Sequence, residues 1–126
     1  MEALMKALIL AALPTAALLI ATPATAEQFS QVNDPAPGAA SLLNSDYASA
    51  EREIRAANVS KYDPARSINL GIALAKQGRR DDAAKQFNRV LLEQDVEMVV
   101  ADGQTVMSHE VAQRALTALE NGVLSR

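Results

Sequence analysis

The sequence contains no cysteine and no tryptophan, and aromatic residues make up only 3% of it. Without cysteine the chain cannot form disulfides, so its fold must depend on packing alone. It also lacks the acylated cysteine by which a lipoprotein is attached to a membrane. The few aromatic residues are spread along the chain and do not gather into a surface on which bases could stack. These absences exclude a disulfide-stapled domain and disfavour a single-strand nucleic-acid binder.

Positive charge is also in short supply. The chain has 12 Lys and Arg against 15 Asp and Glu, which gives a net charge of −3. The positive residues are scattered along the sequence, and the pair Arg79-Arg80 is followed at once by Asp81-Asp82. Because nucleic-acid binding requires a basic footprint, we expect no nucleic-acid partner.

Residues with catalytic chemistry are scarce as well. His109 is the single histidine, and it has no second ligand for a metal ion and no partner at the spacing of a catalytic triad. The carboxylate pairs Asp81–Asp82 and Glu51–Glu53 fit a helix start and a solvated helix face. We therefore expect no enzyme, no cofactor, no metal site and no small-molecule substrate. A small hydrolase or metal-dependent enzyme using His109 is the disfavoured alternative.

The first 26 residues have the order of a secretory signal peptide. Lys6 precedes an apolar run over residues 7–20, and Ala24-Thr25-Ala26 provides a small-x-small cleavage site. Cleavage near Ala26 would leave Glu27–Arg126 as a periplasmic or secreted protein, with a Gram-negative periplasm as the expected location. The alternative is an uncleaved N-terminal helix that tethers the protein to the membrane, although the run is short for a span.

The mature chain is expected to begin with a flexible linker over residues 27–44. Its segment 34–38 reads Asp-Pro-Ala-Pro-Gly, a composition typical of loops. A short helical turn is predicted at residues 39–43. Asp46 then provides an N-cap for a helix that runs to about Ala57.

A helical hairpin follows. Asp63 and Pro64 suit the start of its first helix, and Gly78 suits the end. Asp81 or Asp82 is expected to begin the second helix. The first helix carries two apolar stripes, as an inner helix would, and the second carries one. The apolar residues are Ile68, Leu70, Ile72, Leu74 and Ala75 in the first helix, and Ala83, Ala84, Phe87, Val90 and Leu91 in the second.

Small residues occur where these two helices must meet. Gly71 and Ala83 would let the two backbones approach closely. The block resembles a tetratricopeptide repeat, a helix-turn-helix unit of about 34 residues. The positions that carry the resemblance are Leu70-Gly71, Leu74, Gly78, Ala83 and Phe87.

The resemblance extends upstream. The pairs Ala50–Ala83 and Ile54–Phe87 are each separated by 33 positions, which is close to the repeat period. The family's tryptophan is absent, with Ser67 or Ile68 in its place, and Asp95 replaces its closing proline. The resemblance therefore predicts about one and a half repeats over residues 45–95. A helical hairpin that belongs to no particular family is the alternative.

The pattern changes after Asp95. Two β-prone runs flank Asp102-Gly103, which predicts a two-stranded β-hairpin over residues 96–107 with a type I′ turn. Ser108 is the expected N-cap of a C-terminal helix over residues 108–122, which would cap the repeats. The predicted fold is therefore mainly α, with antiparallel helical hairpins of tetratricopeptide type, a small two-stranded hairpin and a C-terminal capping helix.

The resemblance also implies a function. In such folds the first helix of each repeat lines the inner surface, and this assigns partner binding to Ala65, Ile68, Ile72, Ala75 and Lys76. Because four of these five are apolar, the inner face is either filled by the chain's own hairpin or last helix, or it receives an apolar partner segment. The expected role is a non-catalytic adaptor or scaffold that binds another envelope protein or a second copy of itself. A membrane-tethered accessory subunit of an envelope complex is the alternative.

Overall fold

The computed structural model describes residues 22–23, 36–100 and 102–125. Within these residues the fold is mainly helical with a small antiparallel sheet, as the sequence predicted. The predicted signal peptide and the first part of the predicted linker lie outside the described residues, apart from residues 22–23. The helices are α3 (Ala39–Leu43), α4 (Tyr47–Ala56), α5 (Pro64–Lys76), α6 (Arg80–Leu92) and α7 (Ser108–Glu120); the strands are β1 (Thr22–Pro23), β2 (Glu97–Val99) and β3 (Thr105–Met107).

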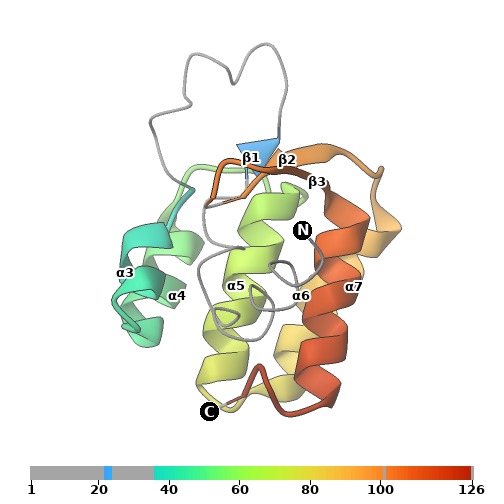
Figure 1. The fold of residues 1–126 in the computed structure, drawn as a ribbon. Helices are drawn as coiled ribbons and strands as arrows, with labels where there is room; N and C mark the ends of the chain where they lie inside the picture. The colour runs from blue at the N-terminus through green and yellow to red at the C-terminus, as the bar shows by residue number, and fades with distance from the viewer. Residues whose placement is uncertain (1–21, 24–35, 101, 126) are drawn as a thin grey trace.

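Helix α5 occupies the centre of the molecule (Figure 1). It packs against α4 on one side, α6 behind and α7 on the other side, and α6 and α7 also pack together. The small sheet lies across one end of the bundle. Ten of the thirteen residues of α5 are buried, which explains why its sequence carries two apolar stripes.

The starts of α4 and α5 follow the predicted capping chemistry. The Asp46 carboxylate accepts a hydrogen bond from the backbone N–H of Ser49 at 3.1 Å. The Asp63 carboxylate accepts one from the N–H of Arg66, also at 3.1 Å, and Pro64 is the first residue of α5. Each aspartate satisfies an N–H group that has no partner within its helix. Both predicted N-caps are confirmed.

The turn between α5 and α6 closes on Gly78, as predicted. Gly78 has a φ of +84°, which glycine adopts without the steric cost of a side chain. The N–H of Arg79 donates to the Leu74 carbonyl at 3.0 Å, and the N–H of Gly78 donates to the Ala75 carbonyl at 2.9 Å. These bonds satisfy carbonyl groups at the end of α5 in a Schellman motif. The second helix begins at Arg80, so Asp81 and Asp82 lie in its first turn.

The predicted close approach of α5 and α6 is present at Gly71. The fully buried ring of Phe87 packs directly onto it. A Cβ atom at position 71 would stand 2.8 Å from Cζ of Phe87 and 2.9 Å from Cδ1. The glycine and the aromatic ring therefore form one unit that sets the distance between the two helices.

The described end of the predicted linker is not a free segment. Residues 39–43 form α3, which packs on α4, and Leu42 and Ala39 are buried in the core. The helical turn predicted at these residues is confirmed. Burial of a leucine side chain offsets the entropy of ordering this short stretch, by roughly 1.5–3 kcal/mol.

The β-hairpin is present, but its turn differs from the predicted one. Val100 donates its N–H to the Gln104 carbonyl at 2.9 Å, and Gly103 donates to the Val100 carbonyl at 2.8 Å. A two-residue loop of Asp102 and Gly103 would be closed by the residues on either side of that pair, whereas the bond from Val100 to Gln104 encloses three residues. The turn is therefore a three-residue loop, and it ends on Gly103 with a φ of +85°.

The sheet also contains a strand that the sequence did not predict. Thr22 pairs with Val99 and Pro23 with Met98, so β1 lies antiparallel to β2, and β2 lies between β1 and β3. The side chain of Met98 is fully buried. Through it, the sheet contributes to the core that the helices build.

The start of helix α7 is capped by Asp95, a residue of an earlier loop, and not by Ser108. Asp95 lies in the loop before β2, and its Oδ1 accepts from the N–H of His109 at 2.9 Å and from Oγ of Ser108 at 3.2 Å. Ser108 is fully buried, and its Oγ accepts from the N–H of Val96 at 3.0 Å. Ser108 was predicted to be the N-cap but is the first residue of the helix, because the loop carboxylate satisfies the helix start.

Candidate functional site

The inner positions predicted to bind a partner lie in the core. Ile68, Ile72 and Ala75 are fully buried, and Ala65 is 3% exposed. They sit on α5, which α4, α6 and α7 enclose. In this structure these four residues therefore offer no apolar surface to a partner.

Lys76, the fifth predicted position, is half-buried at the end of α5. Its Nζ donates to the carbonyl of Ser125 at 3.1 Å and lies 5.9 Å from the centre of the Tyr47 ring. Next to Ser125, Leu124 is buried in the core. Lys76 thus holds the end of the chain against the helices.

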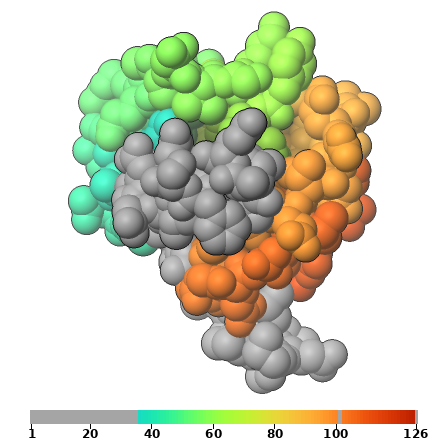
Figure 2. All heavy atoms as spheres, turned by 90° about the horizontal axis from the view of Figure 1, so that it is seen from above, coloured from blue at the N-terminus to red at the C-terminus, as the bar shows by residue number. Residues whose placement is uncertain are grey.

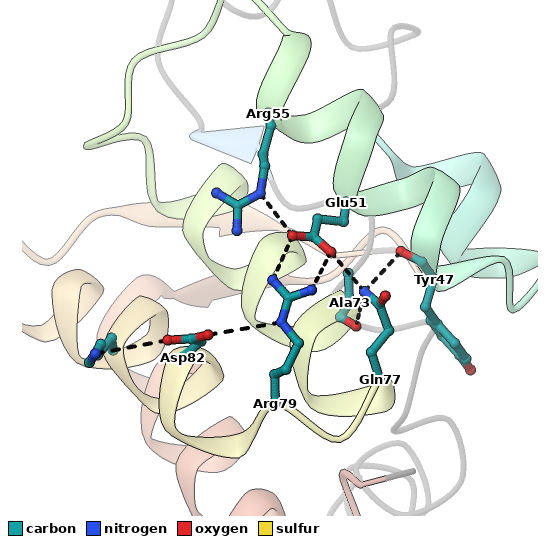
Figure 3. A network of polar contacts seen from close by, with 8 residues as sticks. Tyr47, Glu51, Arg55, Ala73, Gln77, Arg79 and Asp82 are labelled. Atoms are coloured by element: carbon teal, nitrogen blue, oxygen red, sulfur yellow. Dashed lines mark hydrogen bonds and ion pairs between the residues drawn. The ribbon is translucent and has the colours of Figure 1, made fainter.

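Helix α4 and the α5–α6 turn are joined by a network around Glu51 (Figure 3). The guanidinium of Arg79 donates to both carboxylate oxygens, at 2.8 and 2.7 Å. Arg55 adds a bond of 2.9 Å and Gln77 one of 3.0 Å. Glu51 was expected on a solvated helix face, but its side chain is only 14% exposed because it turns toward Arg79.

This network has an electrostatic consequence. The hydrogen bonds from Arg79 are the largest cause that lowers the pKa of Glu51 from its usual 4.5 to about 2. Burial opposes this shift, and the bonds from Arg55 and Gln77 add smaller contributions to it. The carboxylate raises the pKa of Arg79 in turn. A bidentate pair with further donors is among the stronger arrangements of charged groups in proteins. Glu51 therefore acts as a fixed junction between the first helices and the α5–α6 hairpin.

A second group of charged residues consists of arginines gathered at one end of the bundle. Arg55 lies in the last turn of α4, Arg66 in the first turn of α5, and Arg89 in the last turn of α6. These three residues form what we call the arginine cluster. Since consecutive helices run antiparallel, the three turns lie at the same end of the bundle. Lys61 is beside them, because Nη1 of Arg89 reaches the Lys61 carbonyl at 3.4 Å.

Arg66 is the least compensated member of the arginine cluster. Its Nε is buried without a hydrogen-bond partner in the described part of the chain. Burial lowers the pKa of Arg66, and the positive charges of Arg55 and Arg89 lower it further; Asp63 alone opposes them. No ion pair between described residues includes Arg66 or Arg89. The cluster was not predicted, because its members are separated in sequence and are brought together only by helix packing.

His109 takes part in a structural contact. Its Nε2 lies 2.7 Å from the carbonyl of Glu93. Its backbone N–H donates to the Asp95 carboxylate that caps α7. Among the described residues, no group of three or more His, Asp or Glu side chains is arranged to hold a metal ion. In the same residues, no helix has the length and apolar character needed to cross a membrane.

Comparison with protein families, curated proteins and solved structures finds no match to this chain.

Proposed function

We propose that this chain is an exported protein–protein interaction module that acts as an adaptor or scaffold in a bacterial envelope and has no catalytic activity. Support comes from the packed helical hairpins, from the resemblance of residues 45–95 to tetratricopeptide repeats, and from the signal-like order of residues 1–26. Small helical-hairpin units of this kind commonly present a rigid surface to another protein.

One observation carries the proposal. The apolar faces of the helices are used by the chain's own core, whereas the ends of α4, α5 and α6 hold cations that the described residues leave without carboxylate partners at Arg66 and Arg89. Repulsion among these like charges opposes folding at Arg66, which Arg55 and Arg89 both act on. Uncompensated charge on a rigid scaffold is better explained as a surface that meets a partner.

Crosslinking in intact cells tests this function. The full chain is expressed with a C-terminal affinity tag, crosslinked in place, and recovered from the envelope fraction. We expect a discrete crosslinked partner, and we expect Arg66→Glu to abolish it while Arg114→Glu, on α7, retains it. Recovery of the uncrosslinked chain alone would contradict the proposal.

The protein recovered in this experiment also shows whether the N-terminal segment has been cleaved or is retained. Mass spectrometry of the recovered protein gives its first residue. A start at Glu27 supports a free exported module. An intact N-terminus supports the alternative of a membrane-tethered accessory subunit.

A further inference from the structure

Three helix ends bring the arginine cluster to one side of the molecule. Figure 2 shows the α4–α5 connection, in green, next to the segment that follows α6, in orange. The 3.4 Å contact from Arg89 to the Lys61 carbonyl links the last turn of α6 to this connection. Arg55 is the penultimate residue of α4, and its charge acts on Arg66. The surface therefore combines guanidinium groups from three different helices.

Helix dipoles explain two of these arginines but not the third. The C-terminal end of a helix carries partial negative charge, so Arg55 and Arg89 are favourably placed in last turns. Arg66 is in a first turn, where the helix end is already positive. The positive charges of Arg55 and Arg89 also act on it, and its Nε is buried without a hydrogen-bond partner among the described residues. Its position thus costs stability in the isolated protein.

Among the described residues, Glu51 pairs with Arg55 and Asp63 acts on Arg66, and neither carboxylate neutralises the cluster. Glu51 is shared between Arg55 and Arg79, and Arg79 holds both of its oxygens. Asp63 is occupied as the N-cap of α5, and burial raises its pKa. The guanidinium groups of Arg66 and Arg89 consequently retain capacity for an anion from outside the chain.

We propose that Arg55, Arg66 and Arg89 bind a carboxylate-rich segment of the partner protein. This inference rests on the proposed function and names the chemistry of the partner. The planar guanidinium matches the geometry of a carboxylate and donates two parallel hydrogen bonds to it. A protein segment with spaced carboxylates fits better than a densely anionic membrane or nucleic acid, because Glu51 and Asp63 lie among the arginines and the chain carries a net charge of −3.

A labelled hexaglutamate peptide tests the proposal. Its fluorescence anisotropy is measured against the full chain at about 20 mM and about 150 mM salt, with a hexaglutamine peptide as the uncharged control. We expect hexaglutamate to bind and hexaglutamine not to bind, and we expect the affinity to fall with salt. Arg66→Gln and Arg89→Gln should each weaken binding by about tenfold, the effect of losing a hydrogen bond to a charged group.

Arg114→Gln is the matched control, because it removes the same charge from α7, where Arg114 pairs with Glu110. Its affinity for hexaglutamate should equal that of the wild type. Thermal unfolding adds a second readout: Arg66→Gln should keep or raise the melting temperature, since it removes a repulsive charge. A lower melting temperature for Arg66→Gln would assign Arg66 a structural role and overturn the proposal.

Other results would overturn it as well. These are no binding of hexaglutamate, an equal loss of affinity in Arg114→Gln, or binding to vesicles rich in phosphatidylglycerol without binding to hexaglutamate. The failure of this inference is distinct from that of the proposed function. If cells still yield the crosslinked partner with Arg66→Gln and Arg89→Gln combined, the interaction module stands and the acidic partner segment does not.

Discussion

At the residue scale, Gly71 is a position with no room for a side chain. Helices α5 and α6 meet there through the ring of Phe87, with no space for a Cβ. The ring is enclosed on its other sides by the core, so it has no free direction in which to move. The spacing of the two helices therefore depends on the absence of one methyl group.

We expect Gly71→Ala to destabilise the fold by roughly 2–4 kcal/mol through overpacking, despite the better helix propensity of alanine. Phe87→Ala should cost roughly 3–5 kcal/mol by leaving a cavity. Gly103→Ala is the comparison, since its Cβ would meet nothing within 4 Å and only its φ of +85° opposes it, at about 1 kcal/mol. Urea unfolding gives all three values, and a Gly71→Ala cost no larger than that of Gly103→Ala would contradict the close approach.

Glu51 gives the second residue-scale prediction. Glu51→Gln should lower the free energy of unfolding at pH 7 by about 1–2 kcal/mol, because the bidentate bond to Arg79 is lost. The folded pKa of about 2 lies below the unfolded value of 4.5. The contribution of the carboxylate is therefore complete above the unfolded pKa and disappears as the pH falls toward 2.

The difference between wild type and Glu51→Gln isolates this effect. Asp63 has the opposite pH trend, because burial raises its pKa, but it is present in both proteins and cancels. The gap in unfolding free energy should close between about pH 4.5 and pH 2. A gap that stays constant over this range would show that the bond to Arg79 does not depend on the charge of Glu51.

At the element scale, α7 illustrates how a helix start can be supplied by a distant loop. Asp95 accepts from both Ser108 and His109, and Ser108 in turn binds the backbone of Val96. The Asp95 carboxylate links the end of the hairpin region to the helix that follows β3.

We expect Asp95→Ala to destabilise the protein by about 1–2 kcal/mol, the usual cost of removing an N-cap. Amide hydrogen exchange should rise mainly in the first turn of α7, where the N–H groups lose their acceptor. Asp102→Ala serves as the control because its carboxylate accepts one bond, from the N–H of Gln104 in an exposed turn. Equal exchange in α7 for both variants would contradict the capping role.

At the scale of the whole molecule, most of the large apolar side chains of the described residues are buried in the core. Four large apolar side chains are exposed among the described residues, namely Leu43, Tyr62, Leu92 and Met107. They come from separate elements: α3, the α4–α5 connection, α6 and β3. Isolated exposed apolar residues are ordinary on soluble surfaces and do not make an interface by themselves.

We therefore expect the purified chain to be a monomer when light scattering follows size exclusion. Its inner helix is already covered by α4, α6 and α7, which removes the main reason for self-association. A dimer that persists on dilution would instead show that the inner positions of α5 become exposed and pair with a second copy. Lys76→Ala removes the bond to Ser125, and Tyr47→Ala removes the ring beside Lys76, so both variants would then shift the dimer population.

The helix ends were predictable because the residues that mark them lie next to them in the sequence. Asp46, Asp63, Pro64 and Gly78 act within one turn of the helix ends that they mark. The hairpin was found from two β-prone runs, whereas its turn type was wrong because the choice between a two-residue and a three-residue loop depends on strand register. The linker prediction extended too far because Leu42 is buried only once α4 is in place.

The sequence by itself determined the periodicity of the helices, the caps of α4 and α5 and the close approach of α5 and α6 at Gly71, since each depends on spacing over a few helical turns. Only the tertiary structure decided the pairing of Glu51 with Arg79, the cap from Asp95 and the meeting of Arg55, Arg66 and Arg89. It also decided that the apolar inner positions are buried. The reason is that side-chain charges separated by a dozen or more residues become neighbours only when antiparallel helices pack, and no local pattern encodes that approach.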